Sequence, residues 1–224
     1  MSKASVPRKR ISHAERRETA REALLDATLE SLVDVGYDAT TTRGVAEKAG
    51  VTQGAQQHYF PNKASLVDAA MLRLMQKLLA SAATMLIHGD SERERAAALV
   101  DRLWDIHTMP LGRVVFELMA KARTDADMAR RVAPIQVQAI QSVQQVARAL
   151  LPGLAAVPGF DDWLLVTLST LRGTALIAVI PGAEKGVASW PSVRRQVLRS
   201  LDAVIEDAKV APASKARGRA TGGP

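Results

Sequence analysis

The amino-acid sequence predicts an all-α protein. Apolar residues recur at three- and four-residue spacing nearly throughout the 224 residues, and no stretch alternates as a half-buried strand would. Aliphatic side chains must form most of the core, because 47% of the chain is hydrophobic and only 4% is aromatic. A chain of this length can bury one large core or two smaller ones. The periodic segments add up to about nine helices.

Three of these helices are expected in a first domain, residues 14–62. The first runs over residues 14–35 and ends at Gly36, because glycine accepts the positive φ that commonly terminates a helix. A short second helix is expected over residues 42–49. A third, over residues 52–59, begins at a threonine whose hydroxyl can cap it.

Six further helices are expected in a larger domain, residues 63–210. They are predicted over residues 63–88, 92–107, 110–122, 125–151, 161–180 and 191–209. Pro134 should kink or break the fourth of them. Residues 164–180 are apolar almost all round, so a membrane span is an alternative interpretation. Arg172 and the short length favour instead a helix that is buried on two sides.

The chain carries a net charge of +7, and the excess lies in its two ends. Residues 1–10 contain four Lys and Arg and no acid, and residues 211–224 contain three and no acid. We therefore expect a flexible basic arm over residues 1–13 and a disordered basic tail over residues 211–224. Two interpretations stay open: the ends bind a polyanion, or they only keep the protein in solution.

Several classes of function find no support in the sequence. The absence of cysteine excludes disulfides, thiolate nucleophiles and thiolate metal sites. The four histidines lack metal-ligand spacing, and no phosphate-binding, dinucleotide-binding or nucleophile-elbow motif occurs. We therefore predict no enzyme activity, no cofactor and no metal site. No apolar segment follows the basic N-terminus as in a secretory signal, so a cytoplasmic location is expected.

Residues 41–60 have the pattern of a helix-turn-helix. Two short helices flank a tight turn at residues 49–51, and Ala55 lets the helices cross closely. In this motif the N-terminal part of the second helix meets base edges in the major groove of DNA. The residues expected there are Thr52, Gln53, Gln56 and Gln57. Because glutamine can form bidentate hydrogen bonds with adenine, the sequence predicts a DNA-reading surface.

The same segment resembles the tetracycline-repressor (TetR) family of transcriptional regulators. The resemblance covers about residues 14–70 and rests on Gly36-Tyr37, Thr41 to Ala46, Ala49 to Thr52, Tyr59-Phe60, Lys63 and Leu66. It departs from the family at Gln56 and Gln57, where an apolar residue and a tyrosine are common. Gly44 stands where a charged residue is more usual.

The resemblance implies a role at the DNA for each matched residue. The residues expected to hold backbone phosphates are Thr42, Tyr59 and Lys63. Arg43 is expected to reach a base or a phosphate. The residues expected to face the major groove are Thr52, Gln53 and Gln57. An alternative stays open for the threonines, because Thr42 and Thr52 could cap helices without ever touching DNA.

In the family the larger domain holds a small-molecule effector, which moves the DNA-reading heads apart. The candidate effector-pocket residues are Trp104, His107, Met109, Phe116, Met119 and Trp163. The alternative is that these side chains simply fill the core. A homodimer is expected through the last two helices, residues 161–180 and 191–209, which would form a four-helix interface. The apolar stripe assigned to it on the last helix comprises Val193, Val197, Leu198, Leu201, Val204 and Ile205.

These features predict a repressor that a small-molecule effector releases from a palindromic operator. Two alternatives remain: activation, or a ligand-independent DNA-binding protein of the same fold with an architectural or partner-controlled role. Residues 11–63 carry six basic and eight acidic side chains, an awkward balance for a surface that approaches phosphates. We therefore expect the arm to supply non-specific affinity, along the backbone or in the minor groove. Its cations are Lys3, Arg8, Lys9 and Arg10.

Overall fold

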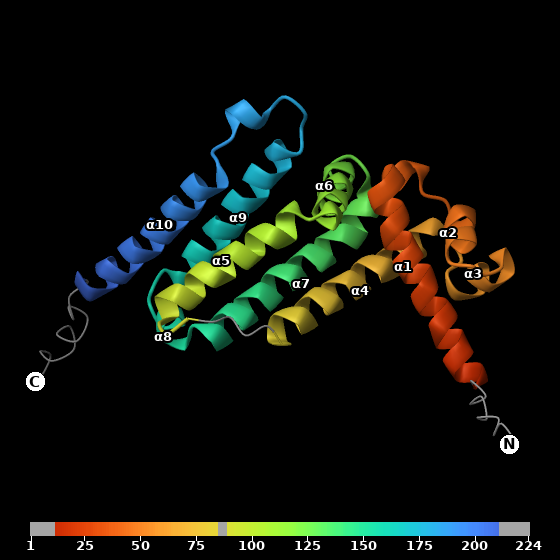
Figure 1. Ribbon diagram of the computed structural model, residues 1–224, viewed down its shortest axis with the longest axis horizontal. Coiled ribbons are helices and arrows are strands. Elements are labelled where there is room, and N and C mark those ends of the chain that lie inside the picture. The colour runs from red at the N-terminus through yellow and green to blue at the C-terminus, as the bar shows by residue number, and fades with distance from the viewer. Residues whose placement is uncertain (1–11, 85–88, 211–224) are drawn as a thin grey trace, which may run out of the picture. The chain divides into compact units, whose positions relative to one another are not determined.

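The computed structural model describes residues 12–84 and 89–210, and the regular elements within these ranges are all helical (Figure 1). In chain order they are α1 (His13–Ala39), α2 (Thr42–Lys48), α3 (Gln53–Tyr59), α4 (Lys63–Thr84), α5 (Glu92–Thr108), α6 (Pro110–Ala122), α7 (Ala126–Leu150), α8 (Pro152–Ala155), α9 (Phe160–Ala178), the 3-10 turn η1 (Glu184–Gly186) and α10 (Trp190–Val210). The all-α prediction is confirmed. The described ranges hold one α-helix more than the nine expected, because α8 forms where the sequence indicated only a break.

Two helices begin with a capping box. The Ser12 hydroxyl accepts a hydrogen bond from the backbone N–H of Glu15 at 3.1 Å, and the Glu15 carboxylate accepts one from the Ser12 N–H at 2.6 Å. Ser91 and Glu94 form the same reciprocal pair at the start of α5. These bonds satisfy N–H groups that a helix otherwise leaves unpaired in its first turn.

The sequence predicts helix interruptions at two positions. Gly36 has φ 75° and ψ 176° and interrupts α1, but one more helical turn follows it to Ala39. Pro134, where a kink or a break was expected, lies inside α7, which continues through it without a break. Proline removes one backbone hydrogen bond, and the turns on either side maintain the helix.

The described residues form two compact units. The first comprises residues up to Ala80 together with Val114–Ala133, and the second comprises Ser81–Arg113 together with the residues from Pro134 onward. The first unit therefore contains most of α4 and α6 and the start of α7 in addition to α1, α2 and α3. Along the chain, α4, α6 and α7 each pass from one unit into the other.

The core of the second unit lies among α5, α9 and α10. The α10 stripe expected at a dimer interface belongs to this core, so these side chains are covered within the subunit; the homodimer through residues 161–180 and 191–209 stays a prediction. The buried members of the stripe are Val193, Val197, Leu198 and Leu201, and Val204 and Ile205 pack against them. The physical reason is that α5 and α9 of the same chain already offer the apolar surface that α10 needs.

The outer face of α9 remains apolar and exposed. Its large side chains are Leu165, Val166, Leu176 and Ile177, and Ile180 follows just after the helix. They recur at helical spacing around the side of α9 that faces away from the core. Among the described residues, no helix combines the length and hydropathy needed to cross a membrane.

Candidate nucleic-acid interface

The two short helices of the motif each begin at a capping threonine. The Thr41 hydroxyl accepts a hydrogen bond from the N–H of Gly44 at 3.0 Å, and the Thr52 hydroxyl accepts one from Ala55 at 3.2 Å. The cap of α2 is therefore Thr41, and Thr42 is its first helical residue. Gly50 turns the chain between the helices with φ 67°. The sequence prediction of both helices and of the turn is confirmed.

One side of the motif presents polar side chains to solvent. Thr52, Gln53 and Gln57 are exposed along α3. Arg43 of α2 is exposed and forms an ion pair with Glu47, with 3.0 Å between its Nε and the carboxylate. A hollow of about 350 Å³ on this surface is lined by Arg43, Ala46, Glu47, Val51 and Gln53. The arrangement offers hydrogen-bond donors and acceptors around a concave surface.

Gln56 does not belong to this exposed surface. Its side chain is fully buried, its Nε2 donates to the carbonyl of Phe60 at 2.7 Å, and its Oε1 accepts from Gln53 at 3.0 Å. The expectation that Gln56 meets a base edge was wrong, because its side chain points into the core and its amide binds the Phe60 carbonyl at the C-terminal end of α3. The apolar residue common at this position in the TetR family was the signal for an inward-facing side chain.

Tyr59 and Lys63 lie at the end of α3 and the start of α4. Tyr59 is half-buried, with the His58 ring edge-on at 5.5 Å between centroids. The Lys63 Nζ donates to the carbonyl of Asp38 at 3.1 Å and lies 4.3 Å from the centroid of the Tyr37 ring. Burial lowers the pKa of Lys63, and Asp38 acts in the opposite direction. The ammonium group thus contacts the end of α1 in the free protein.

Helix α6 also contacts the end of α1. The backbone N–H of Tyr37 donates to the Glu117 carboxylate at 2.8 Å, directly after the interruption at Gly36. One turn further along α6, Lys121 forms an ion pair with Asp38 at 2.8 Å, and this hydrogen bond raises the pKa of Lys121. Sequence reasoning missed these contacts, because Glu117 lies 80 residues from its partner.

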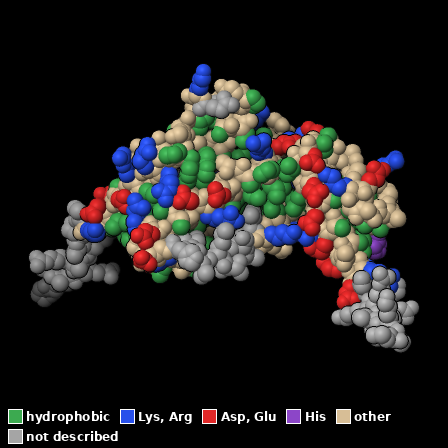
Figure 2. Space-filling view, viewed as in Figure 1, with side chains coloured by type: hydrophobic (Ala, Val, Ile, Leu, Met, Phe, Trp, Pro, Cys, Tyr) green, Lys and Arg blue, Asp and Glu red, His purple; other side chains and the backbone are tan. Residues whose placement is uncertain are grey.

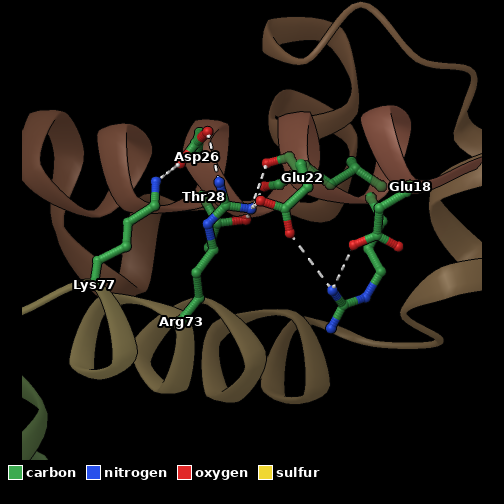
Figure 3. A network of polar contacts seen from close by, with 8 residues as sticks. Glu18, Glu22, Asp26, Thr28, Arg73 and Lys77 are labelled. Atoms are coloured by element: carbon green, nitrogen blue, oxygen red, sulfur yellow. Dashed lines mark hydrogen bonds and ion pairs between the residues drawn. The ribbon is translucent and has the colours of Figure 1, made fainter. Parts of the chain in front are cut away.

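Salt bridges join α4 to α1 within the first unit. Figure 3 shows Arg73 directed toward Glu22 and Asp26, with 3.1 Å between Arg73 and the Asp26 carboxylate. Lys77 approaches the other oxygen of Asp26 at 3.0 Å. The Arg73 side chain is only 13% exposed, so water screens its two ion pairs less than those of a surface residue. These ion pairs hold α4, which directly follows the helix-turn-helix, against α1.

The face of the molecule seen in Figure 2 is not uniformly basic near the motif. Acidic and basic side chains are mixed over the visible surface around α1 (Figure 2). The arm residues expected to supply positive charge, Arg8, Lys9 and Arg10 together with Lys3, lie outside the described residues.

The six candidate effector residues are divided between the two compact units. Phe116, which is buried, and Met119, which is 37% exposed, belong to the first unit. The other four belong to the second unit: Trp104, His107, Met109 and Trp163. Trp163 is a core residue whose Nε1 donates to the carbonyl of Val197 at 3.0 Å, so the core-filling alternative holds for it.

The remaining three candidates lie on or next to α5. Trp104 stacks on Trp190 with 4.6 Å between ring centroids and an interplanar angle of 7°. The Nδ1 of His107 lies 2.6 Å from the carbonyl of Leu103, and Met109 ends the helix as its C-terminal cap. All three are half-buried.

Comparison with known proteins relates the chain to DNA-binding regulators. Residues 24–70 match the family of bacterial regulatory proteins described as the tetR family. An HTH-type transcriptional regulator of Mycobacterium tuberculosis is 25% identical over 193 residues, which cover 85% of this chain and 95% of that protein. The regulator BetI of Burkholderia thailandensis is 36% identical over 90 residues, which cover 40% of this chain and 46% of BetI.

Solved structures show the same fold. A transcriptional regulator from Rhodococcus sp. Rha1 superposes with a TM-score of 0.66 at 24% identity, covering 86% of this chain and 99% of that one. FadR from Bacillus subtilis, solved in complex with stearoyl-CoA, superposes with a TM-score of 0.61 at 16% identity, covering 80% of this chain and 96% of FadR.

Proposed function

We propose that this chain, whose residues 24–70 match the tetR family of bacterial regulatory proteins, is a transcriptional regulator that represses genes from a palindromic operator. The observation that carries the proposal is the exposed polar side of the capped helix-turn-helix. Thr52, Gln53 and Gln57 read base edges from α3, and Arg43 approaches from α2. Contacts to phosphates hold the protein in register on the duplex, and contacts to bases select the sequence.

Phosphate contacts fall to the residues around the motif. Thr42, the first residue of α2, contacts a phosphate at the start of that helix. The Tyr59 hydroxyl and Lys63 provide further contacts, the latter after leaving the Asp38 carbonyl. The basic arm over residues 1–13 supplies the positive charge that residues 11–63 lack.

A homodimer presents two equivalent reading helices to the palindrome. We assign its interface to the exposed apolar face of α9, since α10 uses its apolar stripe inside the subunit. In a two-fold dimer this face, with Val166 and Ile177, would pack against the same face of α9 in the partner subunit. Large apolar side chains that gather on one exposed surface often mark a protein–protein interface.

A small-molecule effector controls the repressor through a population shift. The effector must bind the conformation that cannot engage DNA more tightly than the one that can. The stearoyl-CoA complex of FadR supports an effector in a protein of this fold. The passage of α4, α6 and α7 from one compact unit to the other gives three covalent routes for the signal.

The test is a selection of genomic fragments with the purified protein, followed by affinity measurements on the enriched site and on scrambled DNA at several salt concentrations. A palindromic site preferred at least about a thousandfold supports a specific regulator. Gln53→Ala and Gln57→Ala should reduce that preference, whereas Gln141→Ala, at an exposed position on α7, should not. Enrichment of scattered sites, with no effect of any small molecule, would favour the ligand-independent architectural role instead.

A further inference from the structure

A half-buried arginine in the second unit points at a histidine. The Nε of Arg172, in the middle of α9, donates to Nε2 of His107 at 3.1 Å. The other ring nitrogen of His107 donates to the carbonyl of Leu103 at 2.6 Å. His107 is therefore the neutral tautomer with its proton on Nδ1. Burial lowers its pKa, and the nearby charge of Arg172 lowers it further.

In the part of the chain that the structure describes, the charge of Arg172 has no carboxylate beside it. Among the side chains that the structure describes, no Asp or Glu forms an ion pair with this guanidinium. Two other arginines of the same unit do have carboxylate partners: Arg194 binds Asp101 through two bonds of 2.6 and 2.8 Å, and Arg93 binds Asp202 through two of 2.5 and 2.9 Å. A cation whose partner is a neutral imidazole loses hydration without regaining it from an opposite charge.

The helix dipole does not stabilise the charge of Arg172 either. It lies six residues before the C-terminal end of α9, beyond the last turn in which a helix dipole stabilises a cation. Burial lowers the pKa of Arg172, which is the direction expected for a charge that the protein itself does not stabilise. The hydrogen bond to His107 uses Nε and leaves the two terminal nitrogens, a fork that matches a planar oxyanion.

We infer that Arg172 is the counter-ion for a carboxylate or phosphate group of a small molecule that binds beside α5 and α9. His107 acts as a positioning residue, because its fixed tautomer accepts from Nε and orients the fork. The inference rests on the proposed function, since it gives the effector a chemical class: an anion whose charged group enters the second unit.

The experiment compares three probes with the same alkyl body on the full-length protein: octanoate, octyl phosphate and octan-1-ol. Binding is measured by calorimetry for wild type, Arg172→Gln and Arg172→Lys. Glutamine can still donate to His107 but carries no charge, and lysine keeps the charge but not the fork. Arg195→Gln is the control, because it removes a positive charge from an exposed position of the same unit. Thermal melting establishes that each variant is folded.

The expected result is that one charged probe binds wild type and Arg195→Gln at least about tenfold more tightly than octan-1-ol does. Arg172→Gln should lose that difference, and Arg172→Lys should retain part of it. The more tightly bound head group identifies the anion. Equal binding of charged and uncharged probes to wild type would overturn the inference, as would undiminished binding of the charged probes to Arg172→Gln.

Operator binding is measured in parallel on the site obtained by genomic selection. Specific DNA binding without anion binding at Arg172 would reject the inference and leave the proposed regulator intact. Anion binding that requires Arg172, in a protein without a specific operator, would reject the proposed function and leave the anion site in place.

Discussion

The Glu117 carboxylate lies directly against Gly36: a Cβ built on Gly36 would be 3.2 Å from its nearer oxygen. The same carboxylate accepts the hydrogen bond from the next residue, Tyr37. Gly36 is thus constrained twice, by its positive φ and by the approach of α6. Any side chain at this position would have to displace the acceptor that holds the end of α1.

Gly36→Ala should therefore destabilise the protein. The backbone conformation alone costs about 1–3 kcal/mol for a residue with a Cβ, and displacement of Glu117 adds to it. Gly54→Ala is the matched control, because Gly54 lies inside α3 and a methyl group added there would meet no atom within 4 Å. That change should stabilise α3 by about 0.5–1 kcal/mol. Urea unfolding measures both, and a Gly36→Ala protein as stable as wild type would contradict the assignment.

Neighbouring glutamines of α3 should separate stability from DNA recognition. Gln56→Leu leaves the buried carbonyl of Phe60 without its side-chain donor and should reduce the free energy of unfolding by about 1–3 kcal/mol. Gln57→Leu, at an exposed position, should leave stability nearly unchanged and weaken binding to the selected operator. Chemical denaturation and DNA titration on both proteins check this, and the opposite pattern would mean that Gln56 faces the groove after all.

Deletion of residues 2–10 should flatten the salt dependence of DNA binding. Each arm cation that neutralises a phosphate contributes about −0.9 to the slope of log K against log salt concentration. The preferred sequence should stay the same, because phosphates carry no sequence information. Deletion of residues 211–224, which removes three other basic residues, is the control and should change the slope less. An unchanged slope after the first deletion would exclude a role for the arm.

Val166→Glu should weaken the homodimer. Val166 is 63% exposed on α9, and a carboxylate there would be buried against apolar side chains of the partner subunit. We expect the dimer dissociation constant to rise at least about tenfold, measured by sedimentation. Val137→Glu is the control, because Val137 is 54% exposed on α7 of the same unit. Equal effects of the two substitutions would place the interface elsewhere.

Lowering the pH should destabilise the second unit through His107. Burial holds the pKa of His107 below its ordinary value of 6.5, so below that pH the unfolded chain binds more protons than the folded one. Stability should fall as the pH falls from 6.5, by no more than about 1.4 kcal/mol over the first pH unit. Thermal melting at several pH values should show this component in wild type and its loss in His107→Gln, and identical profiles would refute it.

Local patterns explain why the motif could be predicted. Capping threonines, a turn glycine and apolar spacing all lie within 20 residues, and each acts on its own helix. The contacts of Glu117 could not be predicted this way, because they join segments that only the tertiary fold brings together. The α10 stripe shows the same limit: the spacing around Val197 indicates a buried face but not which surface covers it. From the sequence, Arg172 indicates only that its helix is not a membrane span.

The positions of the tryptophans allow the fluorescence of the two units to be distinguished. All three tryptophans, Trp104, Trp163 and Trp190, lie in that unit, whereas both tyrosines, Tyr37 and Tyr59, lie in the first. Emission excited in tryptophan alone therefore reports on the half proposed to bind the anion, and tyrosine emission originates in the half that reads DNA. The stacked pair of Trp104 and Trp190 makes the first signal sensitive to any movement between α5 and α10. A single unlabelled sample can thus reveal which half of the protein responds first.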